Sequence, residues 1–234
     1  MATLPVVEPG GFVRRRLVVV APHPDDESLG CGGLIAACRA AGVPVSIVVV
    51  SDGAGSHPHS VLYAAPRLAE LRRAEALEAA RRLSVAPQDV HFLDLPDRFV
   101  PVDGPDAERA SAWLAALCTS ADVVAVSWRH DPHTDHKASF ALAQAALREV
   151  AGAALWEYPI WGLTLPPPTI LEGPPVAGVR VRVDGFRDAK RHAVAAHASQ
   201  TTGLIADDPG GFRLTPEVLS LFDTPFETYL GPAT

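Results

Sequence analysis

The chain alternates between short apolar runs and longer segments in which apolar residues recur at helical spacing. An apolar, β-branched run at 15–21 predicts a buried strand, and a helical pattern follows over 28–41. A second valine-rich run within 43–53 completes a strand, helix, strand unit. Because uninterrupted valine runs suit strands that are covered on both faces, the pattern predicts a parallel sheet.

The same alternation continues through the middle of the chain. Apolar stripes predict three further helices, over 65–83, 106–118 and 136–150. Short apolar runs predict three further strands, over 90–95, 122–128 and 154–159. Strands that alternate with helices in this way predict an α/β fold, with a Rossmann-like, mostly parallel sheet and helices on both faces.

Beyond the last of these strands the pattern changes. The segment 163–178 is rich in proline and predicts a stiff loop, and 179–184 alternates valine with charged residues, as a strand at a sheet edge does. We expect a helix over 186–198 to be the last regular element. No repeat or polar linker divides the chain, so we expect one domain over 1–234, with a C-terminal elaboration over about 160–234.

Composition and charge exclude several classes of protein. The 234 residues are 48% hydrophobic and 20% charged, enough for one domain with a sizeable core. No window approaches the roughly 18 uninterrupted apolar residues of a membrane span, and the N-terminus lacks the order of a signal peptide, so we expect a cytoplasmic protein. The net charge of -7 argues against nucleic acid as a partner. Three cysteines, none in a CxxC pair, argue against disulfides and a cysteine-built zinc site.

The sharpest chemical signal is the segment APHPDDE at 21–27, where the first predicted strand gives way to a helix. Ligands of open α/β sheets bind at the carboxyl ends of the strands. His23 and Asp26, three residues apart beside a turn, can converge on one cation, while Asp25 faces whatever that cation binds. The alternative is structural: Asp25 or Asp26 caps the helix and His23 is a turn residue. Glu27 complements the helix dipole and is a candidate to support the site.

A second polar cluster, WRHDPHTDH at 128–136, follows the fourth of the predicted strands. A third ligand from this loop, which holds His130, His133 and His136, would complete a His, Asp, His set with an open position for water. Three mixed nitrogen and oxygen ligands suit a catalytic Zn²⁺, and iron(II) or cobalt would also fit. The alternative is a solvated polar loop.

These segments together resemble the LmbE-like, or PIG-L, family of zinc-dependent de-N-acetylases. The resemblance is carried by residues 21–27 with the GCGG behind them, by HTDH at 133–136 and by the KxxAxxxHxSQ pattern at 190–200. Arg72 and Glu75 also fit the RxxE helix of the family, and 156–161 fits its aromatic strand end. The resemblance therefore extends over most of the chain.

The resemblance implies roles for five residues. His23, Asp26 and His136 would be the metal ligands, Asp25 the general base, and His133 the group that stabilises the oxyanion or protonates the leaving amine. The implied reaction is hydrolysis of the N-acetyl group of an N-acetylglucosamine-type conjugate, a small-molecule partner, with release of acetate and a free amine. The implied cofactor is Zn²⁺.

The sequence departs from the family pattern at two points, and it has two loop histidines to which the resemblance gives no role. Thr134 occupies a position where the family commonly has proline, and the loop before HTDH is short. A substrate contact that the family makes upstream would then fall on Asp131 or His130. His57 and His59 lie in a loop where a substrate would pass, and are equally compatible with exposure to solvent.

Two further residues are candidate substrate contacts. Arg72 either clamps a substrate hydroxyl or phosphate or pairs with Glu70 or Glu75 on its own helix. His197 either closes one wall of a pocket or caps a helix C-terminus.

Other functions were weighed against deacetylation. The same zinc site would suit other small-molecule amidases, and a non-catalytic carbohydrate-binding protein could keep the fold. Gly30, Gly32 and Gly33 follow the first predicted strand, as in a dinucleotide-binding protein, but they do not form GxGxxG.

Overall fold

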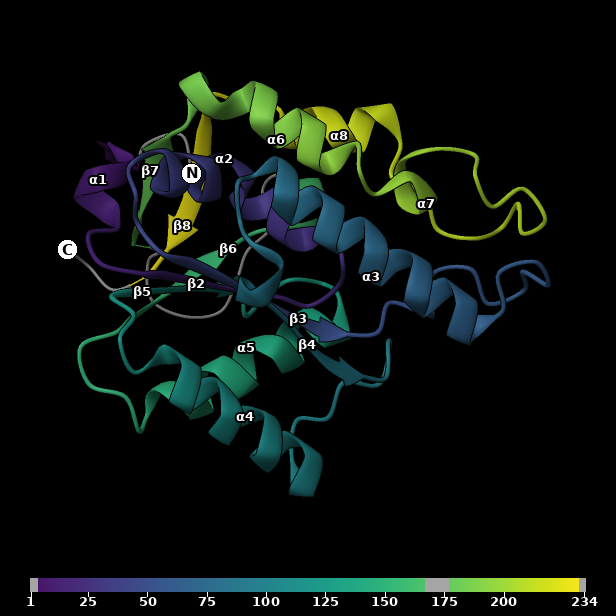
Figure 1. The fold of residues 1–234 in the computed structure, drawn as a ribbon, viewed down its shortest axis with the longest axis horizontal. Helices are drawn as coiled ribbons and strands as arrows, with labels where there is room; N and C mark the ends of the chain where they lie inside the picture. The colour runs from purple at the N-terminus through teal and green to yellow at the C-terminus, as the bar shows by residue number, and fades with distance from the viewer. Residues whose placement is uncertain (1–3, 167–176, 232–234) are drawn as a thin grey trace.

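Eight strands of the described residues form one sheet in the computed structural model, which describes residues 4–166 and 177–231. The order across the sheet is β1-β7-β8-β6-β5-β2-β3-β4, and helices cover both of its faces (Figure 1). The strands are β1 (Val6–Val7), β2 (Leu17–Ala21), β3 (Val45–Ser51), β4 (Val90–Leu95), β5 (Val123–Ser127), β6 (Ala154–Tyr158), β7 (Gly178–Arg182) and β8 (Phe226–Leu230). Only β8 pairs antiparallel to its neighbours among these strands. The predicted α/β fold with a mostly parallel sheet is confirmed.

The helices form two layers. They are α1 (Pro9–Phe12), α2 (Asp26–Ala40), α3 (Ala65–Arg82), α4 (Gly104–Cys118), α5 (Thr134–Leu147), α6 (Arg187–Val194), α7 (Ala198–Thr201) and α8 (Pro216–Phe222). Helices α2, α3 and α6 lie on one face of the sheet, and α4 and α5 lie on the other (Figure 1). None of the described helices is both long and apolar enough to cross a bilayer.

Strand β2 shows why its apolar run is uninterrupted. Leu17 and Val19 belong to the core under α2 and α3, whereas Val18 and Val20 belong to the core under α4 and α5. All four side chains are fully buried. Because successive side chains of a strand point to opposite faces, a strand between two helix layers needs an apolar residue at every position.

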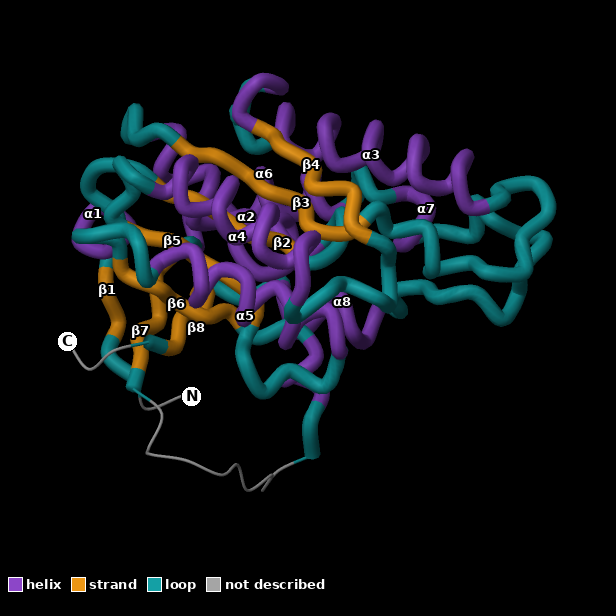
Figure 2. The backbone as a smooth tube through the Cα atoms, turned by 90° about the horizontal axis from the view of Figure 1, so that it is seen from below, coloured by secondary structure: helices purple, strands orange, loops and turns teal. Residues whose placement is uncertain are grey.

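The strand order changes direction at β2, and this change positions the site. From β2 the chain adds β3 and β4 on one side, and it then crosses to add β5 and β6 on the other. The two loops that leave the carboxyl ends of β2 and β5 therefore diverge and leave a crevice between them. Figure 2 shows the sheet from below, with a lobe of loops beyond α7 and one end of α3.

Two segments lie side by side in that lobe, although they are far apart in the sequence. Asp207 accepts hydrogen bonds from the hydroxyl of Ser60 and from the backbone N–H groups of Val61 and Leu62. Phe212 donates its backbone N–H to the carbonyl of Ser56 at 2.8 Å. The loop after β3 is thereby joined to the loop after α7.

The C-terminal third differs from its prediction in three respects. Strand β7 is not at the sheet edge, because β1 pairs with it on one side and β8 on the other. The predicted helix over 186–198 ends earlier, at Val194, and α8 and β8 follow it as further regular elements. The alternation in β7 arises because one face is buried and the other partly exposed, which occurs inside a sheet as well as at its edge. Much of the predicted proline-rich loop lies outside the described residues.

Candidate active site

A pocket of about 480 Å³ opens between the loops that follow β2 and β5. Five stretches of the chain line it. They contribute His23, Asp25, Asp26 and Leu29 after β2; Gly55, Ser56 and Arg72 from the β3–α3 region; Asp97 and Arg98 after β4; Pro132 and His133 after β5; and Trp161, Thr164, Gln200, Phe212 and Leu214 from the C-terminal part.

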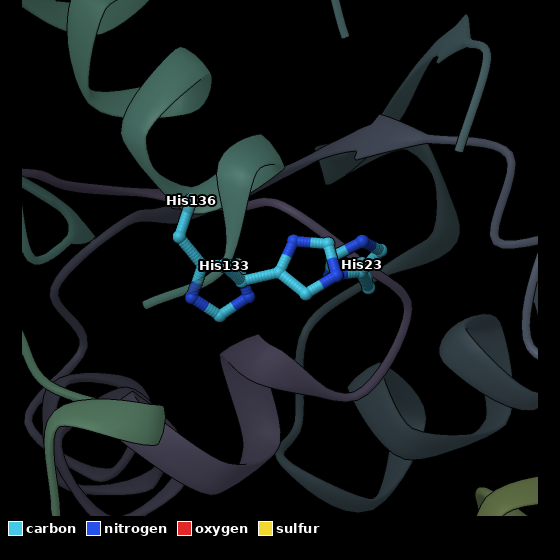
Figure 3. Close-up of side chains that lie close together, drawn as sticks. All are labelled: His23, His133 and His136. Atoms are coloured by element: carbon cyan, nitrogen blue, oxygen red, sulfur yellow. The ribbon is translucent and has the colours of Figure 1, made fainter. Parts of the chain in front are cut away.

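Three predicted ligand atoms converge at the base of this region. Nδ1 of His23 and Nε2 of His136 each lie 3.2 Å from Oδ2 of Asp26. Ligand atoms of a tetrahedral zinc site with bonds of about 2.0 Å lie roughly 3.3 Å apart. Figure 3 shows the imidazoles of His23, His133 and His136 gathered together, and nitrogen atoms of these three lie within 4.8 Å of one another.

His136 supplies the clearest test of whether a metal fits. Its side chain is fully buried, and its two ring nitrogens make no well-formed hydrogen bond among the described residues, although carboxylates of Asp26 and Asp131 lie within 3.3 Å of them. Burial lowers the pKa of His136, but the carboxylates of Asp26 and Asp131 raise it to about 9. The surroundings of His136 therefore favour positive charge, which a divalent cation at this position would supply. The donor set fits a metal ion with mixed nitrogen and oxygen ligands.

Carboxylates behind both imidazoles fix which nitrogen faces the centre. Nε2 of His23 lies 3.2 Å from Oδ1 of Asp97 and 3.2 Å from Oδ2 of Asp135. Nδ1 of His136 lies 3.3 Å from Oδ1 of Asp131. Such outer carboxylates commonly orient histidine ligands and raise their basicity. This role was not predicted for any of the three, although Asp131 and Asp135 lie in the polar cluster after β5 and Asp97 follows the end of β4.

The neighbouring carboxyl groups of Asp25 and Asp26 have pKa values shifted in opposite directions. Burial raises the pKa of Asp26, but the imidazoles of His136 and His23 outweigh it and hold this pKa well below its usual range. Burial raises the pKa of Asp25 to about 7, although the guanidinium of Arg72 opposes the shift. Asp26 is therefore the better anionic ligand, and Asp25 the better proton acceptor near neutral pH.

Asp25 has an unusual backbone conformation. Its φ of 144° and ψ of -29° lie in a region that residues with a Cβ rarely adopt. It precedes α2 as the N-cap residue, yet its side chain makes no capping hydrogen bond within the described chain. Its carboxylate instead lies 3.1 Å from Nη2 of Arg72. The structural alternative, a side-chain cap by Asp25, does not describe this position.

His133 begins α5 and has a defined proton position when neutral. Its Nδ1 accepts the backbone N–H of Asp135 at 3.1 Å. Because a backbone N–H can only donate, the neutral ring carries its proton on Nε2. Burial lowers the pKa of His133, and the neighbouring imidazoles of His23 and His136 lower it further. His133 can therefore donate a hydrogen bond into the pocket as a neutral group.

The loop between β5 and α5 is held by Asp131, which is fully buried. Its Oδ1 accepts the backbone N–H of His133 at 3.2 Å, and its Oδ2 accepts those of Ile160 and Gly162. Asp131 thus has a supporting position behind the loop. Neither Asp131 nor His130 is among the described residues that line the pocket, and His130 is exposed.

Arg72 lines the pocket but is already engaged by the protein. Its guanidinium donates to the carbonyls of Gly53 and Pro24, both at 2.8 Å, as well as to Asp25. Glu75, the expected alternative partner on the same helix, instead accepts from the backbone N–H and the hydroxyl of Ser199. Arg72 therefore holds the loop between β2 and α2 in place.

His197 lies behind the pocket wall. It is not among the described lining residues, and its Nε2 lies 3.0 Å from Oε1 of Glu27. It precedes α7 rather than ending a helix, so the expected C-terminal cap is not seen. Of the two loop histidines, His57 is buried against Gly211, whereas His59 is exposed.

Comparison with known proteins agrees with this geometry. The family described as PIG-L: GlcNAc-PI de-N-acetylase matches residues 18–147. The 1D-myo-inositol 2-acetamido-2-deoxy-alpha-D-glucopyranoside deacetylase of Rhodococcus opacus is 30% identical over 80% of this chain and 82% of its own. A probable N-acetyl-alpha-D-glucosaminyl L-malate deacetylase 2 of Bacillus cereus is 26% identical over 83% of this chain and 88% of its own.

A solved structure shares the fold. The N,N'-diacetylchitobiose deacetylase of Pyrococcus horikoshii superposes with a TM-score of 0.65 at 22% identity, covering 82% of this chain and 72% of that one. The family match spans more than half of the chain, from β2 to the end of α5, and includes both loops that carry the candidate ligands. The chain belongs to the PIG-L family.

Proposed function

We propose that the protein is a metal-dependent deacetylase that hydrolyses the N-acetyl group of an N-acetylglucosamine-type conjugate. The products are acetate and the free amine. Family membership supports the reaction class, and the names of the relatives support an amino-sugar conjugate as substrate. The observation that carries the proposal is the convergence of His23, Asp26 and His136 beside Asp25 and His133, at a pocket of about 480 Å³.

His23, Asp26 and His136 would hold the metal ion, for which Zn²⁺ is our first choice and iron(II) or cobalt the alternatives. The bound ion would supply a Lewis acid that polarises the amide oxygen and lowers the pKa of water to about 7. Asp97 and Asp135 keep Nδ1 of His23 directed at this centre, and Asp131 does the same for Nε2 of His136.

Asp25 serves as the general base in this proposal. Its carboxylate lines the pocket, is not needed as a ligand, and has a pKa raised to about 7 by burial. It takes a proton from the water that attacks the amide carbon and can return that proton to the leaving nitrogen. Arg72 keeps the carboxylate in place through the whole cycle.

His133 stabilises the charge that develops on the amide oxygen. Its Nε2–H is the only polar hydrogen left on the neutral ring, because Nδ1 accepts from the backbone of Asp135. Removal of one donor of this kind commonly costs about 3 to 4 kcal/mol in the activation free energy. This assignment chooses oxyanion stabilisation over protonation of the leaving amine.

The direct test measures acetate and free amine released from a panel of N-acetylglucosamine conjugates, with the metal content of the same preparation. We expect about one metal ion per chain, loss of activity with a strong chelator, and recovery with zinc. O-acetyl esters of the same sugars serve as the comparison, because an ester is a far better electrophile. Exclusive esterase activity, or full activity in metal-free protein, would contradict the proposal.

Two alternatives give different results in the same assay. Another amidase on this metal site would release products only from amides outside the sugar panel, and a carbohydrate-binding protein would bind without turnover. A dinucleotide-binding function has little structural support, because the glycines at the start of α2 allow close packing. A Cβ on Gly30 would lie 2.3 Å from the ring of Tyr158, and one on Gly33 would lie 2.6 Å from Val183.

A further inference from the structure

The strained backbone of Asp25 requires an explanation within the fold. A residue with a Cβ is strained at such a φ and ψ, and the conformation persists only where surrounding contacts determine it. The carbonyl of Asp25 accepts the N–H groups of Ser28 and Leu29, as in an ordinary first helical turn. The contact that distinguishes this residue is on its other side, at its own N–H.

Glu27 provides that contact. Its Oε2 accepts the backbone N–H of Asp25 at 3.0 Å, so the carboxylate reaches back over the residue between them. Its Oε1 accepts the hydroxyl of Ser28 at 2.7 Å. The side chain of Glu27 is 1% exposed, so water does not compensate its charge. A buried carboxylate stays in one position only if a hydrogen-bond donor or a positive charge lies against it.

His197 is that partner, and it comes from 170 residues further along the chain. Its Nε2 donates to Oε1 of Glu27 at 3.0 Å, and its side chain is also 1% exposed. Its Nδ1 has no hydrogen-bond partner among the described residues. His197 is not one of the described residues that line the pocket, and its Nε2 reaches the first turn of α2 through Glu27 and, at 3.3 Å, through the hydroxyl of Ser28.

We propose that Glu27 and His197 are positioning residues that hold Asp25 in its strained conformation and so aim its carboxylate into the pocket. This inference rests on the proposed function where it concerns turnover. The pair acts on the N–H side of Asp25, and Arg72 acts on its carboxylate. The base is thus fixed at both ends, by one group from the start of α7 and one from α3.

The position of the hydrogen-bond donor at residue 197 can be tested with two amide side chains of different length. The side-chain amide of Gln places its N–H groups near the position of the imidazole Nε2, whereas that of Asn places them near Nδ1. We expect His197→Ala and His197→Asn to lower kcat by about 10- to 100-fold, with KM within about twofold and metal content unchanged. His197→Gln is expected to recover most of kcat, because its amide can still donate to Glu27.

Glu75→Gln is the matched control. Glu75 also holds the start of α7, through the N–H and hydroxyl of Ser199, but it has no link to Glu27. If His197 mattered only for the stability of this segment, Glu75→Gln and His197→Asn would reduce kcat alike, and that result would overturn the inference. Equal activity of the Gln and Asn variants at 197, or a rise in KM alone, would also overturn it.

A second measurement does not depend on turnover. The backbone amide proton of Asp25 donates to a buried carboxylate, so it is expected to exchange slowly and to resonate downfield in ¹⁵N-labelled protein. In His197→Asn it is expected to lose both properties, and in His197→Gln to retain them. If the wild type were inactive on the panel but this pattern held, the proposed function would fail while the positioning role stood. An unchanged Asp25 amide in His197→Asn would overturn the positioning role itself.

Discussion

The two loops that form the site are supported by different contacts. The β2 loop, residues 22–25, carries His23 and Asp25 and is fixed by side chains from other parts of the chain, through Arg72 and through Glu27 with His197. The β5 loop, residues 128–133, is fixed by its own Asp131, which reaches the backbone at Ile160 and Gly162, and by Arg129, which donates its backbone N–H and its guanidinium to Glu157 of β6.

The difference concerns two requirements of a hydrolytic site, an oriented base and a bound metal ion. The β2 loop has a strained residue at the position of the base, and strain has to be maintained by contacts that are themselves immobile. The β5 loop has ordinary dihedral angles at His133, where α5 begins. We infer that damage to the support of the β2 loop affects turnover first, and damage to the support of the β5 loop affects metal binding first.

The largest expected effects concern two adjacent residues on the β2 side of the site, Asp25 and Asp26. Asp25→Asn is expected to keep the metal and to lower kcat about 100- to 10,000-fold, because an amide cannot take the proton from water. Asp26→Ala is expected to lose the metal instead, because the anionic ligand is gone. Metal analysis and rate measurement on both variants would check this, and an Asp25→Asn protein that lost its metal but recovered full activity with zinc would reverse the roles.

A smaller effect is expected on the β5 loop. His133→Ala removes the hydrogen bond to the oxyanion and is expected to lower kcat about 100- to 1,000-fold with the metal retained. His130→Ala, at an exposed residue in the same loop, is the control and is expected to keep full activity. The two variants are compared by kcat and by metal content. Metal loss in His133→Ala would identify His133 as a ligand and contradict the assignment.

The smallest effect concerns the support of the β5 loop. Asp131→Asn preserves the shape of the side chain but removes the negative charge beside Nδ1 of His136 and replaces one of the two oxygens that accept backbone N–H groups. We expect a metal affinity about 10- to 100-fold weaker, measured by competition with a chelator. The thermal midpoint is measured in parallel, and an unchanged affinity would show that Asp131 only supports the fold.

The parallel half of the fold was predictable because its signals are local. The strand predicted at 90–95 has those bounds in the structure, and α3 ends one residue before its prediction. The C-terminal third was less predictable, since the position of β8 between β6 and β7 depends on pairing between distant segments. Thr215 and Pro216 give a local start signal for α8, and FETYL alternates as β8 does, but neither was recognised.

The candidate site divides in the same way. Both polar clusters after strand ends were located from the sequence, and the structure brings them to one pocket. The roles of Asp97 and Asp135 behind His23 were not predicted, because such contacts join loops that no short motif connects. His197 was expected either beside the substrate or at a helix C-terminus, and it lies behind Glu27 instead, a position that depends on how α7 packs.

The pocket draws its candidate metal ligands and its outer wall from different segments. The ligands follow β2 and β5, whereas Arg98, Trp161 and Phe212 come from connections that carry none of them. Substitution of these three side chains can therefore change what the outer wall accepts while the candidate ligands stay in place. Relatives with different sugar conjugates can arise from such changes while the chemistry at the strand ends is inherited intact, and directed evolution of this enzyme would begin from the same three wall residues.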